Sequence, residues 1–196
     1  MNYRFLKYFL ALTIPFFAYL SFNGNGIITY APVIEAFLII PVLELFFKPN
    51  SKNLSDAEEE MFKDDRSYDI VLYLLVPIIY FLIWKFLGSM SENLSTSDTV
   101  GRILSMGLIC GGLGINVAHE LGHRNNKFEQ LLAKMLLLPS LYMHFFIEHN
   151  RGHHKNVSTK EDPSSARYGE NIFFFWIRAV VSGYISAWKL ETDKLN

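Results

Sequence analysis

The feature that most constrains this chain is a run of 27 residues without a charge, between Lys7 and Glu35. The sequence Asn-Gly-Asn-Gly at 23–26, typical of a tight turn, interrupts the run near its middle. As a helix, each half is about long enough to cross the roughly 30 Å hydrocarbon core of a bilayer. The run therefore predicts a membrane hairpin with spans near 5–22 and 27–47. We favour a retained first span over a cleaved signal peptide, because no A-x-A cleavage site follows it.

Two further apolar segments, near 69–88 and near 100–118, predict a third and a fourth membrane helix. Apolar residues make up 51% of the chain and charged residues 19%, and the charges concentrate between the spans. A formal net charge of -1 without an arginine-rich stripe excludes a strongly basic nucleic-acid-binding protein. We expect an all-α, polytopic membrane protein of about four to six membrane helices. Residues 1–118 would form its transmembrane region.

Lysine and arginine are unevenly distributed among the loops, which predicts the orientation of the chain. The turn at 23–26 and the loop at 89–99 contain neither residue. The N-terminal tail and the loop after the second span contain Arg4, Lys7, Lys48, Lys52, Lys63 and Arg66. Because positive charge marks the cytoplasmic side, we expect a cytoplasmic N-terminus. The segment that follows the fourth span, from residue 119, should then be cytoplasmic as well.

All six histidines lie within 36 residues, and such a cluster of imidazoles is typical of a metal site. The first group reads His119-Glu120-Leu121-Gly122-His123, and the second reads Glu148-His149-Asn150-Arg151-Gly152-His153-His154. Residues four apart share one helix face, so each group offers one pair of imidazoles that can reach the same ion. The adjacent His154 would point about 100° away from His153, which suits two neighbouring ions better than one.

Three further residues of this region have more than one interpretation. His144 is either a ligand or a donor to a ligand, while Glu120 and Glu148 either bind metal, accept an imidazole N–H, or are solvated. The two groups can meet only if residues 128–147 lie in the interface or dip into the membrane and return. Pro139 offers a break for such a return.

The first group also matches the H-E-x-x-H signature of zinc metalloproteases, in which Glu120 would be the general base for a zinc-bound water. Nitrogen-rich sites suit iron, zinc, copper or nickel. Histidines beside apolar spans favour metal-dependent oxygen chemistry on an apolar substrate, because acid–base side chains cannot cleave an unactivated C–H bond. A membrane zinc metalloprotease and a metal-dependent oxygenase are therefore both open at this point.

The stretch from Asn116 to Glu191 resembles the membrane-bound alkane 1-monooxygenase family, within the membrane fatty acid desaturase and hydroxylase superfamily. The histidine groups alone indicate the superfamily. The sequences Asn-Arg-Gly-His-His at 150–154 and Glu-Asp-Pro-Ser-Ser-Ala-Arg at 161–167 are more specific to the alkane branch. Residues 119–170 are thus expected to form a histidine-box region with a metal site on the cytoplasmic side.

This resemblance implies an oxidoreductase of the bacterial inner membrane that hydroxylates the terminal methyl group of an alkane to give a primary alcohol. It implies two iron ions, O2 as co-substrate, and rubredoxin as the electron donor. It implies iron ligands at His119, His123, His149, His153 and His154, with His144 open between ligand and donor, and it does not identify which catalytic residues act beyond the ligands. A fatty acid desaturase or hydroxylase of the same superfamily is the alternative.

Family members are longer and carry a later His-Tyr-Gly segment and a third histidine box, whereas this chain has no histidine after His154. We therefore expect an N-terminal portion of such an enzyme, catalytically incomplete alone. An accessory membrane protein that retains the boxes and a subunit completed by a second chain are the alternatives. Residues 171–196 are expected to form a helix that either lies in the interface or spans the membrane.

Overall fold

The computed structural model describes residues 3–47, 53, 66–91 and 93–195, and the described residues contain helices but no strand. This confirms the expected all-α class. The chain divides into two compact units, Met1–Gly114 and Ile115–Asn196. Most of the positively charged loop expected after the second span lies outside the described residues.

Three helical segments are long and apolar enough to cross a membrane: Gly26–Glu44, Arg66–Ser89 and Thr96–Gly122. They correspond to the second, third and fourth expected spans, so the chain is a membrane protein. The first expected span forms η1 (Tyr3–Leu12) and α1 (Thr13–Asn23). It is not among the candidate spans found in the described residues.

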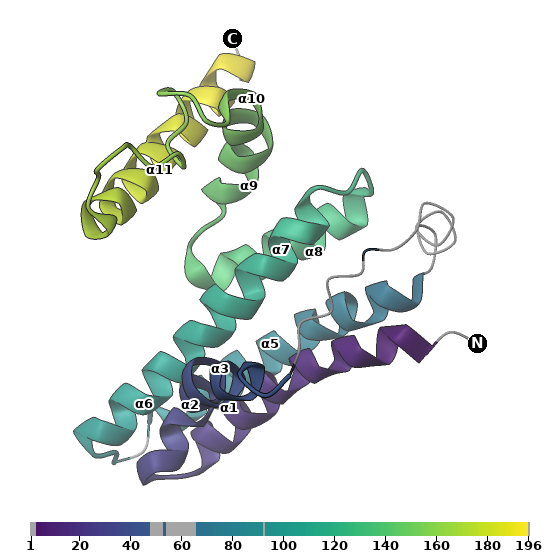
Figure 1. The fold of residues 1–196 in the computed structure, drawn as a ribbon, viewed down its shortest axis with the longest axis vertical. Coiled ribbons are helices and arrows are strands. Elements are labelled where there is room, and N and C mark those ends of the chain that lie inside the picture. The colour runs from purple at the N-terminus through teal and green to yellow at the C-terminus, as the bar shows by residue number, and fades with distance from the viewer. Residues whose placement is uncertain (1–2, 48–52, 54–65, 92, 196) are drawn as a thin grey trace. The chain divides into compact units, whose positions relative to one another are not determined.

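In the first unit, α1 lies beside α5 (Asp69–Ser89), which continues the short η4 (Arg66–Tyr68) (Figure 1). The α5 sequence is apolar on all sides, as expected of a helix without a water-facing side. Ala18 of α1 and Leu75, Ile79 and Leu82 of α5 are almost completely buried. The Phe22 and Phe86 rings meet edge to face with centroids 5.5 Å apart.

The second and fourth expected spans are interrupted by π-helical turns. The second consists of η2 (Gly26–Tyr30), α2 (Ala31–Ile34), η3 (Glu35–Ile39) and α3 (Ile40–Glu44). The fourth consists of α6 (Thr96–Gly107), η5 (Leu108–Gly114) and α7 (Ile115–Gly122). The boundary between the two units falls within this last segment, so α7 belongs to the second unit.

A buried arginine fastens two turns of the first unit. Arg102 is 1% exposed and donates to the carbonyl oxygens of Ser89, at 2.8 Å, and Gly24, at 2.9 Å. Asp98 accepts a 2.6 Å hydrogen bond from the Gly26 backbone N–H. Gly26 has a φ of +66°, which glycine adopts without strain. The predicted turn at 23–26 is therefore tied to α6 and to the end of α5.

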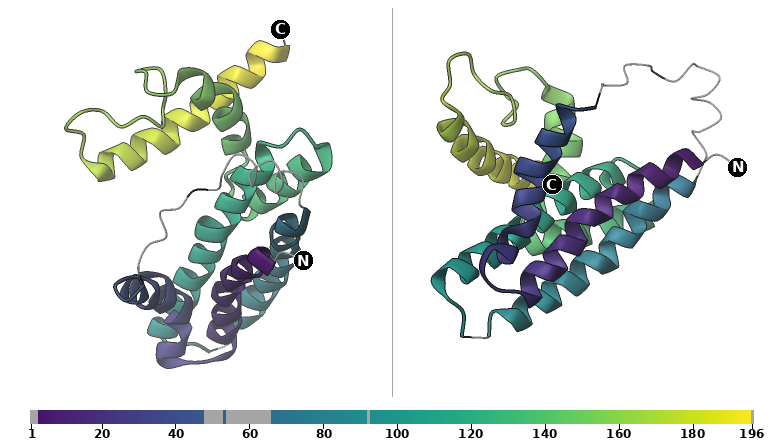
Figure 2. Two further views of the ribbon diagram at one scale, coloured as in Figure 1. Left: turned by 45° about the vertical axis from the view of Figure 1, so that its right-hand side comes forward. Right: turned by 60° about the horizontal axis from the view of Figure 1, so that its bottom comes forward.

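The second unit begins with a helical hairpin of α7 and α8 (Lys127–Leu137), and Figure 2 shows the two helices side by side. The short η6 (Leu138–Ser140) leads into α9 (His144–Glu148), η7 (His149–His153) and α10 (His154–Asn156). A loop then connects to the single long α11 (Ile172–Leu195), which packs against α9. The two histidine groups therefore belong to one unit.

Candidate metal centre

The first histidine pair lies at the end of α7, where His119 is in the last turn of the helix and His123 directly follows its last residue, Gly122. The Nε2 atoms of the two histidines are 3.1 Å apart. Leu121, which is fully buried, faces the packed side of this helix. Directly after α7, Arg124 donates a 2.8 Å hydrogen bond to the carboxylate of Glu129 on α8. This contact fixes the end of α7 that carries His123.

The second group lies on η7, which is a π-helix. The backbone N–H of His154 donates to the carbonyl oxygen of His149, five residues earlier. This widened turn brings both His153 and His154, four and five residues after His149, near the helix face that carries His149. His153 stacks on His149 with ring centroids 5.2 Å apart, and His154 Nε2 lies 3.2 Å from His149 Nε2. His154 therefore also reaches His149, which α-helical spacing did not predict, because the turn is not α-helical.

The two groups meet in space at His123 and His149, whose Nε2 atoms are 3.1 Å apart. Donor nitrogens of His119, His123 and His149 all lie within 4.8 Å of one another, a spacing that one metal ion could bridge. The intervening segment folds back as this meeting requires. Pro139 lies in η6, and Leu141 follows with a left-handed φ of +53°.

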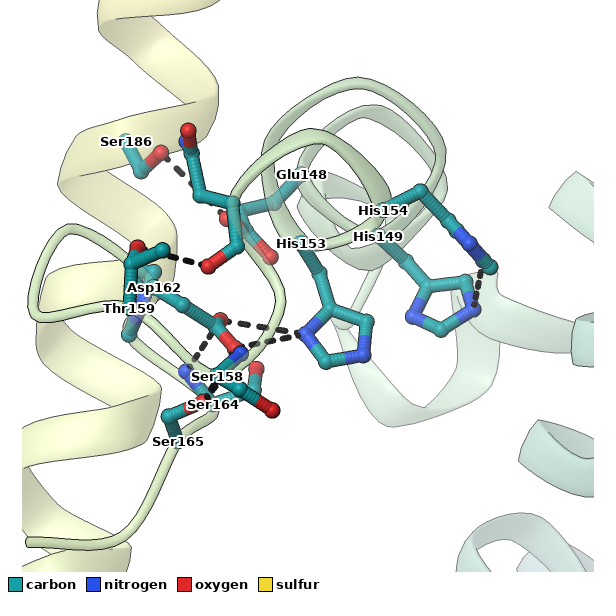
Figure 3. Close-up of polar contacts among 12 residues, drawn as sticks. Glu148, His149, His153, His154, Ser158, Thr159, Asp162, Ser164, Ser165 and Ser186 are labelled. Atoms are coloured by element: carbon teal, nitrogen blue, oxygen red, sulfur yellow. Dashed lines mark hydrogen bonds and ion pairs between the residues drawn. The ribbon is translucent and has the colours of Figure 1, made fainter.

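His153 is held by a carboxylate that the sequence-based site did not include. Its Nδ1 lies 3.0 Å from both carboxylate oxygens of Asp162 (Figure 3). Asp162 is 1% exposed and also accepts hydrogen bonds from the Ser164 backbone N–H, at 2.9 Å, and the Ser165 hydroxyl, at 2.6 Å. A carboxylate on Nδ1 selects the tautomer that leaves Nε2 available as a ligand, a common arrangement around protein-bound metals.

The electrostatics of the site favour the neutral forms of His149 and His123 and the charged form of Asp162. Burial, and then repulsion from His119, His123, His154 and His153, lowers the pKa of His149 to about 4. Burial and the neighbouring His119 and His154 also lower the pKa of His123. Burial opposes ionisation of Asp162, but hydrogen bonds from Ser165, His153 and Ser164 outweigh it and lower its pKa. Neutral imidazoles and an oriented carboxylate are what a metal site requires.

This donor set fits a transition metal. Imidazole nitrogens suit iron, zinc, copper and nickel, and here four Nε2 atoms from His119, His123, His149 and His154 converge at successive separations of 3.1–3.2 Å. A metal ion held among these four nitrogens would accept a lone pair from each of them.

The remaining predicted residues lie away from this convergence. Glu120 is exposed and forms an ion pair with Arg124 at 3.3 Å. Glu148 is 5% exposed and faces α11, where the Ser186 hydroxyl lies 3.4 Å from its Oε1. Burial, and then the charge of Asp162, raises the pKa of Glu148. The His144 ring packs edge to face against those of Tyr142 and Tyr184, and its buried Nε2 has no hydrogen-bond partner among the described residues.

A cavity of about 840 Å³ opens beside the centre within the second unit. His123 and His144 line it, together with apolar side chains that include Phe146, Ile147 and Trp188. The same cavity is also lined by charged side chains, among them Arg124 and Arg151. An apolar molecule and a polar group could therefore both find partners within reach of His123.

Comparison with known proteins places this centre in a family. The fatty acid desaturase family model matches residues 99–195. The chain is 36% identical to the alkane 1-monooxygenase of Pseudomonas putida over 159 residues, which cover 81% of this chain and 39% of the relative. The chain belongs to the alkane 1-monooxygenase family. This confirms the resemblance that its histidine groups and the segment at 161–167 indicated.

Other alkane 1-monooxygenases match over still more of the chain. That of Ectopseudomonas oleovorans is 36% identical over 175 residues, which cover 89% of this chain and 43% of the relative. Alkane 1-monooxygenase 1 of Pseudomonas aeruginosa is 34% identical over 194 residues, covering 95% and 50%. The chain thus spans half or less of the length of these relatives. The residues that match the fatty acid desaturase family model contain the histidine cluster of this chain.

Proposed function

We propose that this chain carries the metal-binding part of an enzyme that hydroxylates the terminal methyl group of alkanes with O2. The observation that carries this proposal is the convergence of four imidazole nitrogens in a chain with three span-capable helices. The relatives support it, because those cited above are all named alkane 1-monooxygenases. The exposed Glu120, paired with Arg124, gives no support to the zinc protease alternative.

In this proposal the centre holds iron. His119, His123, His149 and His154 would bind through Nε2, and His153 would join them through the nitrogen that Asp162 leaves free. Bound iron with O2 would supply the oxidant that an unactivated C–H bond requires. A full site of two ions follows from the family resemblance.

The chain's own residues would orient the ligands and exclude water. Asp162 holds the proton of His153 on Nδ1, while Ser164 and Ser165 hold Asp162 in place. The apolar wall of the cavity, with Phe146 and Trp188, would bind an alkyl chain beside His123. We further propose that the chain is a multi-pass protein of the bacterial inner membrane, where alkanes dissolve in the lipid. The distribution of lysine and arginine among its loops supports a cytoplasmic N-terminus. Rubredoxin would donate the electrons.

The test combines metal content with product formation. The chain, reconstituted in lipid vesicles and loaded anaerobically with Fe(II), is expected to bind iron. Primary alcohol from a medium-chain alkane is expected, with rubredoxin, its reductase and O2, when the remaining portion of a family member that carries the later histidines is reconstituted with it. Acyl lipids offered in parallel examine the desaturase alternative. Bound iron without any alcohol from the completed assembly would overturn the hydroxylation and leave the metal site standing, whereas alcohol from the chain alone would overturn its catalytic incompleteness. Stoichiometric zinc in preference to iron would overturn the iron assignment.

A further inference from the structure

One side of the helix α11 packs against its own unit, and two of its charged side chains, Arg178 and Glu191, also contact that unit. Arg178 donates to the Glu170 carboxylate at 2.6 and 2.7 Å and to the Ser165 carbonyl oxygen at 2.9 Å. Near the other end, the Glu191 carboxylate accepts a 2.8 Å hydrogen bond from Arg151. The helix therefore meets polar partners of its own unit near both ends.

The opposite side of α11, which we call the outer face, is apolar and exposed. No charged residue occurs between Arg178 and Lys189, or before Arg178 in this helix. Six large side chains of the outer face are 53–72% exposed: Phe173, Phe174, Ile177, Val181, Ile185 and, at its edge where it also borders the cavity, Trp188. Helical spacing places them on one broad side, whereas Ser186 and the buried Gly183 and Ala187 face inward.

A helix at a protein–water surface normally turns its apolar stripe toward the core and its charged side chains toward solvent. In α11 an apolar side is the exposed one, which is the reverse arrangement. A continuous apolar patch of this kind on a water-exposed surface would cost hydrophobic free energy and promote aggregation. Hydrocarbon is the surrounding medium for which the arrangement is favourable. The bilayer is also a partner that this chain necessarily has, because three of its helices are long and apolar enough to cross it.

We propose that α11 lies lengthwise in the membrane interface, with its outer face in the acyl chains of one leaflet. Lipid is the occupant of this face, and Trp188 at its end is a residue type enriched at such interfaces. The helix is not itself among the candidate spans found in the described residues.

The polar contacts decide between lying in the interface and spanning the bilayer. Arg178 and Glu191 are 13 residues apart, which corresponds to about 20 Å along a helix. The helix is bonded at one point to the loop that contains Glu170 and at the other to Arg151 of η7. A spanning α11 would carry that loop, or η7, into hydrocarbon, where irregular backbone cannot satisfy its hydrogen bonds. A helix parallel to the membrane keeps both partners in the polar layer.

This placement has a consequence for the histidines, which rests on the proposed function. Because α11 contacts η7 and α9, an interfacial α11 brings His149 and its neighbours to the membrane surface. A substrate dissolved in the leaflet could then approach the centre without crossing water. The placement of α11 itself depends on neither metal nor activity.

Spin labels on single cysteines test the proposal in the intact chain in lipid vesicles. Cys110→Ser removes the native thiol, and Phe174→Cys, Val181→Cys and Trp188→Cys place labels along the outer face. We expect collisions with O2 to exceed those with a polar nickel chelate at all three positions. The depth should be similar at each, roughly 5–10 Å below the headgroups. Ala179→Cys, on the inner side, is the matched control and should be shielded from both reagents.

Three results would overturn the proposal, and each has its own pattern. A spanning helix would give depths that change by about 20 Å between positions 174 and 188. A covering protein, or a second copy of the chain, would protect all three positions from both reagents. A water-exposed face would favour the nickel chelate. Trp188 fluorescence in a Trp84→Phe, Trp176→Phe variant gives an independent measure, with stronger quenching expected from lipids brominated near the headgroup than near the methyl end.

Discussion

The two histidine groups reach the same point by different means. On α7, ordinary helical spacing aligns His119 with His123, and apolar packing against α8 supports the helix. On η7, a widened turn aligns the imidazoles, and a distant carboxylate, Asp162, orients His153. The first group is therefore specified locally, whereas the second depends on contacts with the loop and helix that follow it. Changes outside the histidines should weaken the second group more than the first.

The largest effect is expected from the residue that joins the groups. His149 Nε2 lies within 3.2 Å of two other imidazole nitrogens, whereas His119 Nε2 has one such neighbour, His123. We expect His149→Ala to reduce iron affinity on the order of 100-fold or more, and more than His119→Ala does. Anaerobic Fe(II) titration of the reconstituted chain measures both. His144→Ala is the control, because its ring lies against Tyr142 and Tyr184, and loss of iron in that variant would contradict this placement.

The second effect compares the carboxylate that contacts His153, Asp162, with the carboxylate inside the first group, Glu120. Asp162→Asn keeps the shape of the side chain but removes the charge that holds the proton of His153 on Nδ1, so iron affinity should fall roughly 10- to 100-fold. Glu120→Gln is the matched change in the first group. It should leave iron affinity nearly unchanged, because Glu120 is exposed and paired with Arg124. Equal losses in the two variants would show that Glu120 also supports the centre and would remove the contrast between the groups.

The third effect uses a glycine that precedes the second histidine of each pair. A Cβ on Gly152 would overlap Glu148 Oε1 and come within 3.2 Å of Leu190 on α11, whereas one on Gly122 would meet Phe146 at 3.4 Å. We expect Gly152→Ala to destabilise the second unit by about 1–3 kcal/mol. For Gly122→Ala, the helix-propensity gain of up to about 1 kcal/mol should offset most of the crowding. Thermal unfolding in vesicles compares them, and the reverse order would contradict the packing described for η7.

The sequence predicted those features that depend on local spacing or on segment composition. Spans two to four were placed to within a few residues, because apolar length alone defines them. The pairing of His119 with His123 followed from α-helical periodicity. The position of His154 did not, because nothing in the local pattern signals a π-turn. Asp162 was missed as a site residue, since it lies in an irregular loop nine residues after His153, where no periodicity relates the two.

The smallest effect concerns the ion pair that anchors this loop to α11. Hydrogen bonding to Arg178, and then to the Arg167 backbone N–H, lowers the pKa of Glu170 from its ordinary 4.5 to about 2. A carboxyl group with a lowered pKa stabilises the folded state above its ordinary pKa, and this contribution disappears as the pH falls from about 4.5 to about 2. Protection of residues 163–171 against hydrogen exchange should therefore decrease across this window.

Glu170→Gln distinguishes this ion pair from general acid denaturation. The variant should show weaker protection of the loop already at neutral pH, and the additional decrease between pH 4.5 and about 2 should be lost. Residues of α8, in the hairpin that carries the first histidine group, serve as the internal reference and should keep their protection in both proteins. A parallel loss in the loop and in α8 would mean that the unit opens as a whole. The second histidine group would then not depend on its loop more than the first depends on its hairpin.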